Sequence, residues 1–281
     1  MIVELIEKEK KCECSGTMYV AETTESYVTY KCEECQESVR VDSNGKKIEL
    51  KESKPSTKGK LIIIESGTDG SGKETQAKLL KSRLEKEGHK VIQISFPNYG
   101  TPACGPVELY LSGAFGNKPS DTNAKASSIL YAVDRFASFK QGWSKEYYEG
   151  YIIIADRYTT SNMVHQGVKM SLHERADYLD WLTDLEYNIF GLPKPDEVVF
   201  LNVNPKTTAK LREGRLNKAT NQKKQDIHEV NLEYLKQSYE NALNIAHEQG
   251  WTEVCCDTGG SMREIADIHE DVYKIVKKHL T

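Results

Sequence analysis

The sequence has no apolar run long enough for a membrane helix, and we expect no secretory leader, so membrane-spanning and exported proteins are disfavoured. A membrane-spanning helix needs roughly 18–20 consecutive apolar residues, whereas the longest candidate, residues 61–64, has the length of a buried strand. Residues 1–11 contain several carboxylates and lack the apolar core of a signal peptide. We therefore expect a cytoplasmic protein that has no membrane partner.

An excess of positive charge and a disulfide framework are also lacking. The 281 residues include 38 Lys and Arg against 42 Asp and Glu, a formal net charge of −4, so bulk charge does not favour nucleic acid. The seven cysteines are an odd number in a chain without a leader, which argues against a disulfide scaffold. We interpret Cys104, Cys255 and Cys256 as packing residues, and the four clustered cysteines are considered below.

The composition changes near residue 58. We predict a zinc-ribbon-like module over residues 1–41, a linker or weak strand over 42–59, and a kinase-like domain over 60–281. Short apolar runs at 61–65, 91–95, 151–155, 197–203 and 253–256 alternate with helical stretches at 74–87, 123–148, 171–190, 227–248 and 262–279. This alternation predicts an α/β fold, a doubly wound parallel five-stranded sheet flanked by helices, beside a small N-terminal β-hairpin ribbon.

A glycine-rich loop after the first apolar run gives the strongest functional signal. Gly67, Gly72 and Lys73 have the G-x-x-x-x-G-K spacing between a predicted strand and a predicted helix. Glycines let backbone N–H groups close around an anion, and the helix N-terminus adds partial positive charge. The residues predicted to bind ATP together with Mg²⁺ are Gly67, Thr68, Asp69, Gly70, Ser71, Gly72, Lys73, Glu74 and Thr75.

Glu74 stands where this motif usually has Ser or Thr to bind Mg²⁺. Either Glu74 points away, and waters together with another carboxylate hold the Mg²⁺, or catalysis is impaired. We favour the first interpretation, because the Gly-Lys-x-Thr-Gln ending of the loop resembles adenylate kinases, where this position varies.

Four further segments resemble the thymidylate kinase family, and they occur in that family's order. They are FPNYGTP at 96–102, YAVDR at 131–135, DRYTTSN at 156–162 with Gln166 and Gly167, and GLPKPD at 191–196. Asp69 in the phosphate loop also resembles the family. The resemblance covers Lys60 to the C-terminus and implies a P-loop kinase that transfers the γ-phosphate of ATP to dTMP. It also implies a homodimer built on helices next to the acceptor site.

The resemblance gives roles to the matching acceptor residues. It implies that Tyr131 stacks on the base, that Arg135 one helical turn later contacts a base carbonyl, and that Asn162 binds the base edge. It also implies that Arg157, after a predicted strand, grips the acceptor phosphate with its bidentate guanidinium. The structural alternatives are core packing for Tyr131, an intrahelical salt bridge for Arg135, and an ion pair with Asp156 or another acid for Arg157. The full acceptor set is Phe96, Tyr99, Tyr131, Arg135, Asp156, Arg157, Asn162, His165, Gln166, Asp226 and His228.

Phosphoryl transfer needs positive charge at the transferred group rather than a nucleophilic side chain. The phosphate loop has no arginine, so the resemblance implies that a mobile lid supplies one, from Arg212 or Arg215, unless these belong to a solvated basic helix end. Asp69 is expected to orient Mg²⁺ or the acceptor, and Asp156 to act through a Mg²⁺-bound water. The predicted catalytic set is Lys73, Asp69, Arg157, Arg212 and Arg215.

Two cysteine pairs near the N-terminus, Cys12 with Cys14 and Cys32 with Cys35, are separated by 17 residues. The β-prone segments 17–20 and 27–30 between them predict a hairpin that brings four thiolates around one structural Zn²⁺. Redox-active or incidental cysteines are the alternative. Because residues 1–58 contain ten Lys and Arg against twelve Asp and Glu, we favour a scaffold or docking role over nucleic acid binding.

Two alternatives to a dTMP kinase stay open. His165 and His228 stand where the family often has aromatic residues. The first alternative is therefore an acceptor other than dTMP, namely another or a modified deoxynucleoside monophosphate. It does not apply if both histidines are neutral substitutions. Glu74 and the cysteine segment motivate the second alternative, a nucleotide-binding regulatory protein with weak or no turnover.

Overall fold

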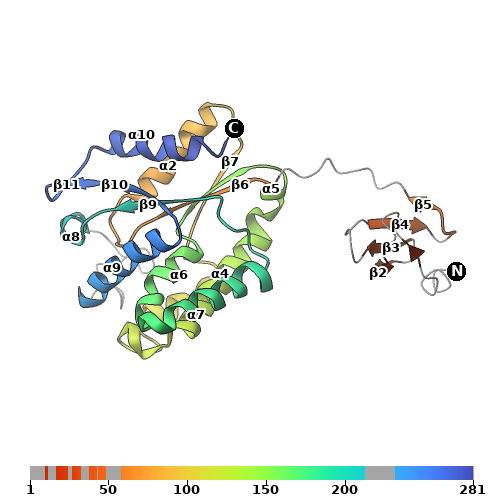
Figure 1. Ribbon diagram of the computed structural model, residues 1–281, viewed down its shortest axis with the longest axis horizontal. Helices are drawn as coiled ribbons and strands as arrows, with labels where there is room; N and C mark the ends of the chain where they lie inside the picture. Colours follow the sequence, from red (N-terminus) through yellow and green to blue (C-terminus); the bar gives the residue numbers. More distant parts are fainter. Residues whose placement is uncertain are drawn as a thin grey trace. The chain divides into compact units, whose positions relative to one another are not determined.

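The computed structural model describes residues 10–11, 17–24, 27–32, 38–42, 44–48, 58–212 and 232–280. The chain forms two compact units, Met1–Thr57 and Lys58–Thr281, and each is described by itself (Figure 1). Within the described ranges, no helix is both long enough and apolar enough to cross a bilayer.

The first unit contains an antiparallel sheet with the strand order β1-β2-β3-β4-β5. Its strands are β1 (Lys10–Lys11), β2 (Thr17–Thr23), β3 (Tyr27–Cys32), β4 (Ser38–Asp42) and β5 (Lys47–Ile48). The expected hairpin is confirmed as β2 and β3, in whose register Met18 is the partner of Cys32. The sheet extends beyond this hairpin, since β4 pairs with β3 and β5 lies within the segment expected to be a linker or weak strand.

The second unit contains the predicted five-stranded parallel sheet. Its strands are β6 (Lys60–Glu65), β7 (Val91–Ser95), β8 (Ile152–Asp156), β9 (Glu197–Asn202) and β10 (Thr252–Cys255). They lie in the order β10-β9-β6-β8-β7, and all four neighbouring pairs are parallel. Two further short strands, β11 (Asp257–Thr258) and β12 (Ser261–Met262), form an antiparallel pair. The phosphate loop therefore follows the central strand, where ligands of such sheets bind.

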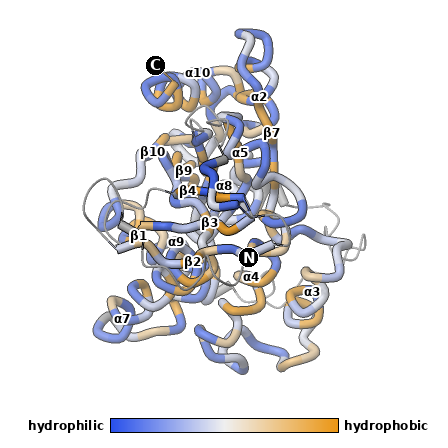
Figure 2. The backbone as a smooth tube through the Cα atoms, turned by 90° about the vertical axis from the view of Figure 1, so that its right-hand side faces the viewer, coloured by the Kyte–Doolittle hydropathy of each residue, from blue (hydrophilic) through white to orange (hydrophobic). Residues whose placement is uncertain are grey.

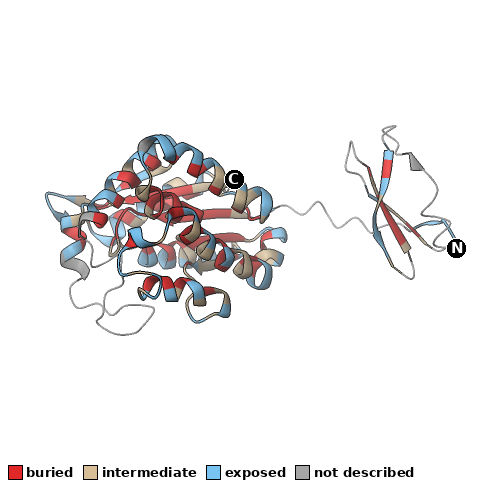
Figure 3. Cartoon of the chain, turned by 90° about the horizontal axis from the view of Figure 1, so that it is seen from below, coloured by how far each residue is buried: buried red, intermediate tan, exposed pale blue. Residues whose placement is uncertain are grey.

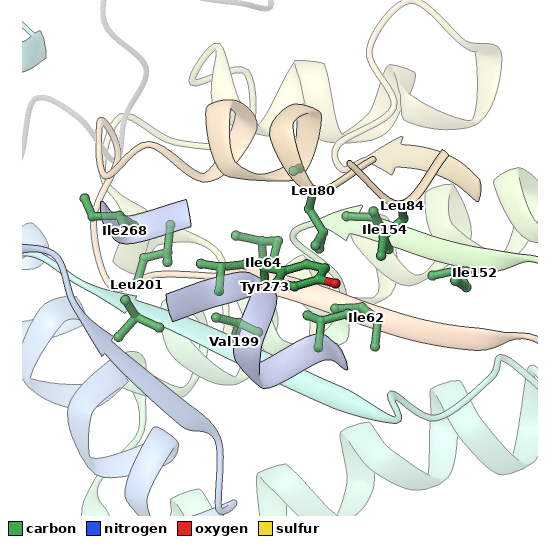
Figure 4. Packing of buried hydrophobic residues seen from close by; sticks show 14 of the residues in the cluster. Ile62, Ile64, Leu80, Leu84, Ile152, Ile154, Val199, Leu201, Ile268 and Tyr273 are labelled. Carbon is green, nitrogen blue, oxygen red and sulfur yellow. The ribbon is translucent and has the colours of Figure 1, made fainter. Parts of the chain in front are cut away.

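Alternate residues of the central strand β6 face two different layers. Ile62 and Ile64 pack in one cluster with side chains of α2 and α10, and Figure 4 shows this packing from close by. Leu61 and Ile63 belong to a second cluster with Phe139 and neighbouring aromatic residues. Because both faces are covered, the strand is apolar from Leu61 to Ile64, and Figure 3 shows buried residues running along the strands between the helices.

The helices match the predicted pattern in outline and differ from it in detail. They are α2 (Lys73–Lys86), α3 (Gly105–Leu111), α4 (Ala124–Ser138), α5 (Ser144–Tyr148), α6 (Thr159–His165), α7 (Leu172–Thr183), α8 (Pro205–Arg212), α9 (Leu232–Glu248) and α10 (Ile265–Lys277). The helix expected over 123–148 is confirmed as a continuous helical stretch, in which a π-helical turn at Phe139–Trp143 joins α4 to α5. Another π-helical turn, Asp184–Ile189, ends the helix expected over 171–190. The short helices α3, α6 and α8 were not expected.

Candidate functional site

The phosphate loop runs from the end of β6 to the start of α2. Gly72, just before the helix, has φ +92°, a conformation that favours glycine. Lys73 is only 6% exposed, and its Nζ donates to Ser66 Oγ at 2.8 Å and lies 3.9 Å from Asp69 Oδ1. The lysine side chain is therefore folded back over the loop, as a residue that meets phosphate oxygens must be.

Arg157 lies at the end of β8 and joins the loop to the acceptor side of the site. Its Nη2 forms an ion pair with Asp69, and its Nη1 donates to Ser161 Oγ at 3.3 Å and meets His165 Nε2 at 3.0 Å. Nη1 is also 3.6 Å from the carboxylate of Glu65. Arg157 has φ +69°, uncommon for a residue with a Cβ, and such conformations cluster at functional sites.

The charges of this cluster shift one another's pKa values. Burial alone would raise the pKa of Asp69, but Arg157 and Lys73 outweigh it and hold that pKa well below its usual range. Burial lowers the pKa of Lys73, as does repulsion from Arg157. Burial opposes the charge of Arg157, yet Asp69 and Glu65 together raise its pKa. Since the Asp69 side chain is 42% exposed, solvent moderates its part of the network.

Glu65 is a site residue that the sequence interpretation missed. It ends the apolar strand β6, is fully buried, and accepts from Thr160 Oγ1 at 2.7 Å and Ser161 Oγ at 2.6 Å. Its other oxygen accepts from the backbone N–H of Ser66 at 2.9 Å. This carboxylate ties the start of the phosphate loop to α6. The available signal was a charged residue within a buried strand.

Asp156 is the last residue of β8 and is 4% exposed. Its Oδ1 is buried and makes no hydrogen bond to any residue that the structure describes. A buried carboxylate oxygen without a protein partner fits a water held by Mg²⁺, because Mg²⁺ usually keeps several waters and prefers oxygen ligands.

Glu74 pairs with Lys78 on the first turns of α2, with 2.8 Å between Oε1 and Nζ. The carboxylate is 46% exposed. Such an i,i+4 pair lies on the outer surface of the helix. This geometry agrees with a Glu74 side chain directed away from the lysine of the loop.

The aromatic residues expected at the acceptor site lie in two different clusters. Phe96 is 4% exposed and packs against Tyr158 with 6.0 Å between ring centroids. Tyr131 meets Tyr110 edge to face at 6.2 Å. Tyr99 is partly buried beside the same cluster. Tyr99, Tyr110 and Tyr131 thus form an aromatic wall, which belongs to a cluster separate from the two core clusters of the sheet.

Arg135 has a partner that the sequence did not reveal. Its guanidinium donates to both carboxylate oxygens of Glu186, at 2.6 and 2.5 Å, and to the carbonyl of Tyr158 at 3.4 Å. Arg135 is 1% and Glu186 0% exposed. This buried bidentate pair spans 51 positions of sequence, so the expected intrahelical alternative does not apply. The base contact stays a prediction that rests on the remaining N–H groups.

Two amides lie one helical turn apart, Asn162 in α6 and Gln166 directly after its last residue. Asn162 Nδ2 donates to the carbonyl of Ser128 in α4 at 3.2 Å. Gln166 follows four positions later, on the same face. It is 1% exposed, and its side-chain oxygen has no hydrogen-bond partner within the described part of the chain. A buried amide without a protein partner is suited to hydrogen-bond a ligand.

Lys169 follows these amides in the sequence, and its side chain contacts Tyr110 of the aromatic wall. Its Nζ donates to Tyr110 Oη at 3.0 Å, to the carbonyl of Thr122 at 3.0 Å and to Ser127 Oγ at 3.1 Å. No carboxylate among the described residues pairs with this ammonium. Burial lowers the pKa of Lys169 from 10.5 to about 8.

We expect the free energy of unfolding to rise by about 1–2 kcal/mol between pH 7.5 and 9.5 through Lys169. In that range the folded chain loses the Lys169 proton while the unfolded chain keeps it, so higher pH favours folding. Urea unfolding at both pH values measures the change in the free energy of unfolding for the wild type and for Lys169→Met. The part due to Lys169 is the wild-type change minus the change in the variant. Lys86→Met, at an exposed position, is the control that keeps the increment. Equal increments in all three proteins would contradict the prediction.

Several predicted residues lie outside the described residues, namely Arg215, Asp226, His228, Cys12, Cys14 and Cys35. Arg212 is the last residue of α8, and its side chain is not described. Cys32 is buried in the small core of the first unit.

Known proteins resemble this chain in sequence and in fold. The family model described as Thymidylate kinase matches residues 64–267. Thymidylate kinase of Mycobacterium tuberculosis is 31% identical over 158 residues, 55% of this chain and 71% of the relative. That of Plasmodium falciparum is 29% identical over 223 residues, 79% of this chain and 91% of the relative. The solved thymidylate kinase of Candida albicans superposes with a TM-score of 0.61 at 22% identity, covering 79% of this chain and 92% of that one.

Proposed function

Because this chain belongs to the thymidylate kinase family and so phosphorylates dTMP with ATP, we propose that its reaction takes place between the phosphate loop and the end of β8. An oxygen of the dTMP phosphate attacks the γ-phosphorus, a new P–O bond forms, and the bond to the β–γ bridging oxygen breaks to release ADP. The observation that carries this proposal is the contact of Arg157 with Asp69, beside Lys73.

Each residue of this cluster has a distinct proposed role. Lys73 binds the β- and γ-phosphate oxygens, and Arg157 binds the acceptor phosphate. Asp69 holds Arg157 in place and orients the acceptor. Thr68, Gly70, Ser71, Gly72 and Thr75 complete the ATP site around Gly67, which packs closely on α9. Positive charge from Arg212 or Arg215 in the following segment is proposed to stabilise the transferred group.

Mg²⁺ accompanies ATP in this family and neutralises charge on the β- and γ-phosphates. The residues that fit it are Asp156, through the buried Oδ1 described above, and Asp69. Both carboxylates border the phosphate loop, so either is able to hold a Mg²⁺-bound water.

We propose that the base lies between the aromatic wall of Tyr131 and the amides of Asn162 and Gln166. Stacking provides affinity without selecting a base, whereas Asn162, Gln166 and Arg135 supply the hydrogen bonds that do. Phe96 and Tyr99 are also proposed to line the acceptor site, and Asp226 and His228 to approach the sugar from the segment before α9.

The decisive experiment measures ADP formation from ATP and Mg²⁺ by the purified chain. It includes dTMP, dUMP, dCMP, dGMP, dAMP or UMP as the acceptor, and a reaction without acceptor. Preference for dTMP supports the proposal, and preference for another acceptor keeps the site but changes the substrate. Nucleotide binding without turnover favours the regulatory protein, and Glu74→Ser is then the first variant to make.

A structural Zn²⁺ in the first unit is a second proposal, supported by strand register. Lys11 pairs with Thr17, Lys31 with Ser38, and Met18 with Cys32. The connections 12–16 and 33–37 therefore begin and end at the same end of the sheet. They carry three of the four clustered cysteines, and the fourth, Cys32, borders the second connection. Two such cysteine pairs at adjacent hairpins suit tetrahedral Zn²⁺.

We expect about one zinc ion per purified chain, and its loss in Cys14→Ser and Cys35→Ser. Elemental analysis measures the metal, and dTMP turnover is expected to be unchanged because the kinase residues lie in the other unit. Cys255→Ser, at an exposed position of β10, is the control that keeps the zinc. Equal metal content in all four proteins would refute the site.

A homodimer is the third proposal, supported by apolar residues exposed on two neighbouring helices. Ile129 and Val133 are one turn apart on α4 and are 42% and 41% exposed, and Leu109 of α3 is 52% exposed. The helices α3 and α4 contact each other, and Figure 2 shows apolar stretches on both. A patch shared by two copies would be covered by a symmetric contact.

Val133→Asp is therefore expected to weaken the dimer at least about tenfold, since it buries a charge in an apolar interface. Light scattering after size exclusion measures the mass of the wild type and the variant. Ile265→Asp, at a 57% exposed position on α10, is the control that leaves the dimer intact. A monomeric wild type would end this proposal. We also propose a cytoplasmic location for this protein.

A further inference from the structure

The environment of His165 suggests a role beyond lining the acceptor pocket. Its Nε2 lies 3.0 Å from Nη1 of Arg157. A guanidinium has only N–H donors and stays protonated in proteins, so this contact requires an Nε2 that carries no proton. The imidazole is then neutral, with its proton on Nδ1.

The backbone of His165 is anchored independently of this contact. The hydroxyl of Tyr234, in the first turn of α9, donates to the carbonyl oxygen of His165. Asn241 of α9 donates to the carbonyls of Met163 and Val164, at 3.2 and 2.7 Å. The end of α6 is therefore fixed against α9, and the imidazole meets Arg157 from a defined position.

We propose that His165 is a positioning residue, which holds the Arg157 guanidinium ready for the acceptor phosphate only while the imidazole is neutral. This inference rests on the proposed function, because it concerns how the acceptor phosphate is captured. Protonation turns Nε2 from an acceptor into a donor and places a second cation beside Arg157. Capture of the phosphate then weakens in acid although the guanidinium itself stays charged.

The other ionisable groups around this contact do not replace the imidazole. Among the residues that the structure describes, they are Asp69 and Lys73 of the phosphate loop, Glu65 of β6, Asp156 of β8 and Tyr234 of α9. Asp69 meets the other guanidinium nitrogen, Nη2, and Arg157 keeps it ionised. Glu65 is occupied by Thr160, Ser161 and the loop backbone. Protonation of His165 in mild acid thus removes one of the two hydrogen-bond acceptors of Nη1 and leaves Ser161 as the other.

Two variants separate the hydrogen bond from the titration. His165→Gln keeps an oxygen that can accept from Arg157 but does not ionise, and His165→Leu removes the acceptor. At pH 7.5 we expect His165→Leu to raise KM for dTMP about tenfold with little change in kcat, the effect of losing one hydrogen bond to a charged group. His165→Gln is expected to restore most of this loss.

The pH profile is the test of the titration. Calorimetric dTMP affinity of the wild type is expected to fall between pH 7.5 and 5.5 about five- to tenfold more than that of His165→Gln. Titration of the dTMP phosphate is common to both proteins and cancels in this ratio. Thymidine, which lacks the phosphate, is the control ligand, and it is expected to show no excess loss.

If the wild type turned over dTMP, and its dTMP affinity fell between pH 7.5 and 5.5 only as much as that of His165→Gln, this inference would be overturned and the proposed function would stand. Wild-type dTMP affinity retained in His165→Leu at pH 7.5 would overturn it as well. A wild-type chain that neither binds nor phosphorylates dTMP at pH 7.5 would overturn the proposed function, and the inference with it.

Discussion

Replacing Arg157 by alanine is expected to lower kcat/KM for dTMP about 10²–10³-fold, the cost of removing a charged donor from an active site. The guanidinium lies between the phosphate loop and α6 and is held by Asp69, Ser161 and His165. Alanine leaves ATP affinity nearly unchanged, because Lys73 and the loop backbone remain. Steady-state kinetics with dTMP varied, together with ATP binding by calorimetry, measures both quantities.

Two comparison variants show what the loss means. Arg157→Lys keeps a positive charge but cannot form the bidentate contact, so we expect it to recover only a small part of the activity. Arg83→Ala removes a surface arginine that pairs with Glu270 and is expected to leave kinetics unchanged. Near-normal turnover of Arg157→Ala would show that Arg157 only balances the buried carboxylates.

The sheet could be predicted from the sequence because its strands are buried on both faces. Such strands need continuous apolar runs, and the run at 61–65 became β6 within one residue of its expected start. The phosphate loop was predictable for a related reason, since its glycine spacing occurs between a strand and a helix. In both cases the signal is local, and tertiary contacts agree with it.

Residues paired across long stretches of sequence could not be predicted in this way. Arg135 and Glu186 are 51 positions apart, and neither residue carries a spacing pattern that names the other. Glu65 resembled the polar end of a strand, although its partners Thr160 and Ser161 lie 95 and 96 positions away. These contacts depend on how β6, β8 and α6 come together, which the local sequence does not encode.

The details of the helices that the sequence did not predict also have physical causes. Residues 139–143 continue the apolar periodicity of α4, so the sequence predicts the continuous helix but not the π-helical turn within it. Phe139 and Trp143 of this turn are buried in the second core cluster. The helix α3 has only seven residues, too few for periodicity to separate it from a loop.

Substituting Lys73 by methionine is expected to reduce kcat about 10²–10³-fold, since the ammonium proposed to meet the β- and γ-phosphates is removed. The same change is expected to leave the urea midpoint unchanged or slightly higher. Lys73 is 6% exposed, and burial and Arg157 both lower its pKa, so the folded chain holds this charge at a cost. Methionine fills a similar volume without that cost.

Lys78→Met is the matched control, because Lys78 lies on the same helix and its side chain is 65% exposed. We expect it to keep wild-type turnover. Opposite changes in activity and stability for Lys73→Met would identify a residue kept for chemistry at the expense of folding, as expected for an active-site cation. If Lys73→Met instead lost stability in step with activity, its bond to Ser66 would be structural, and phosphate binding would depend on the loop backbone and Arg157.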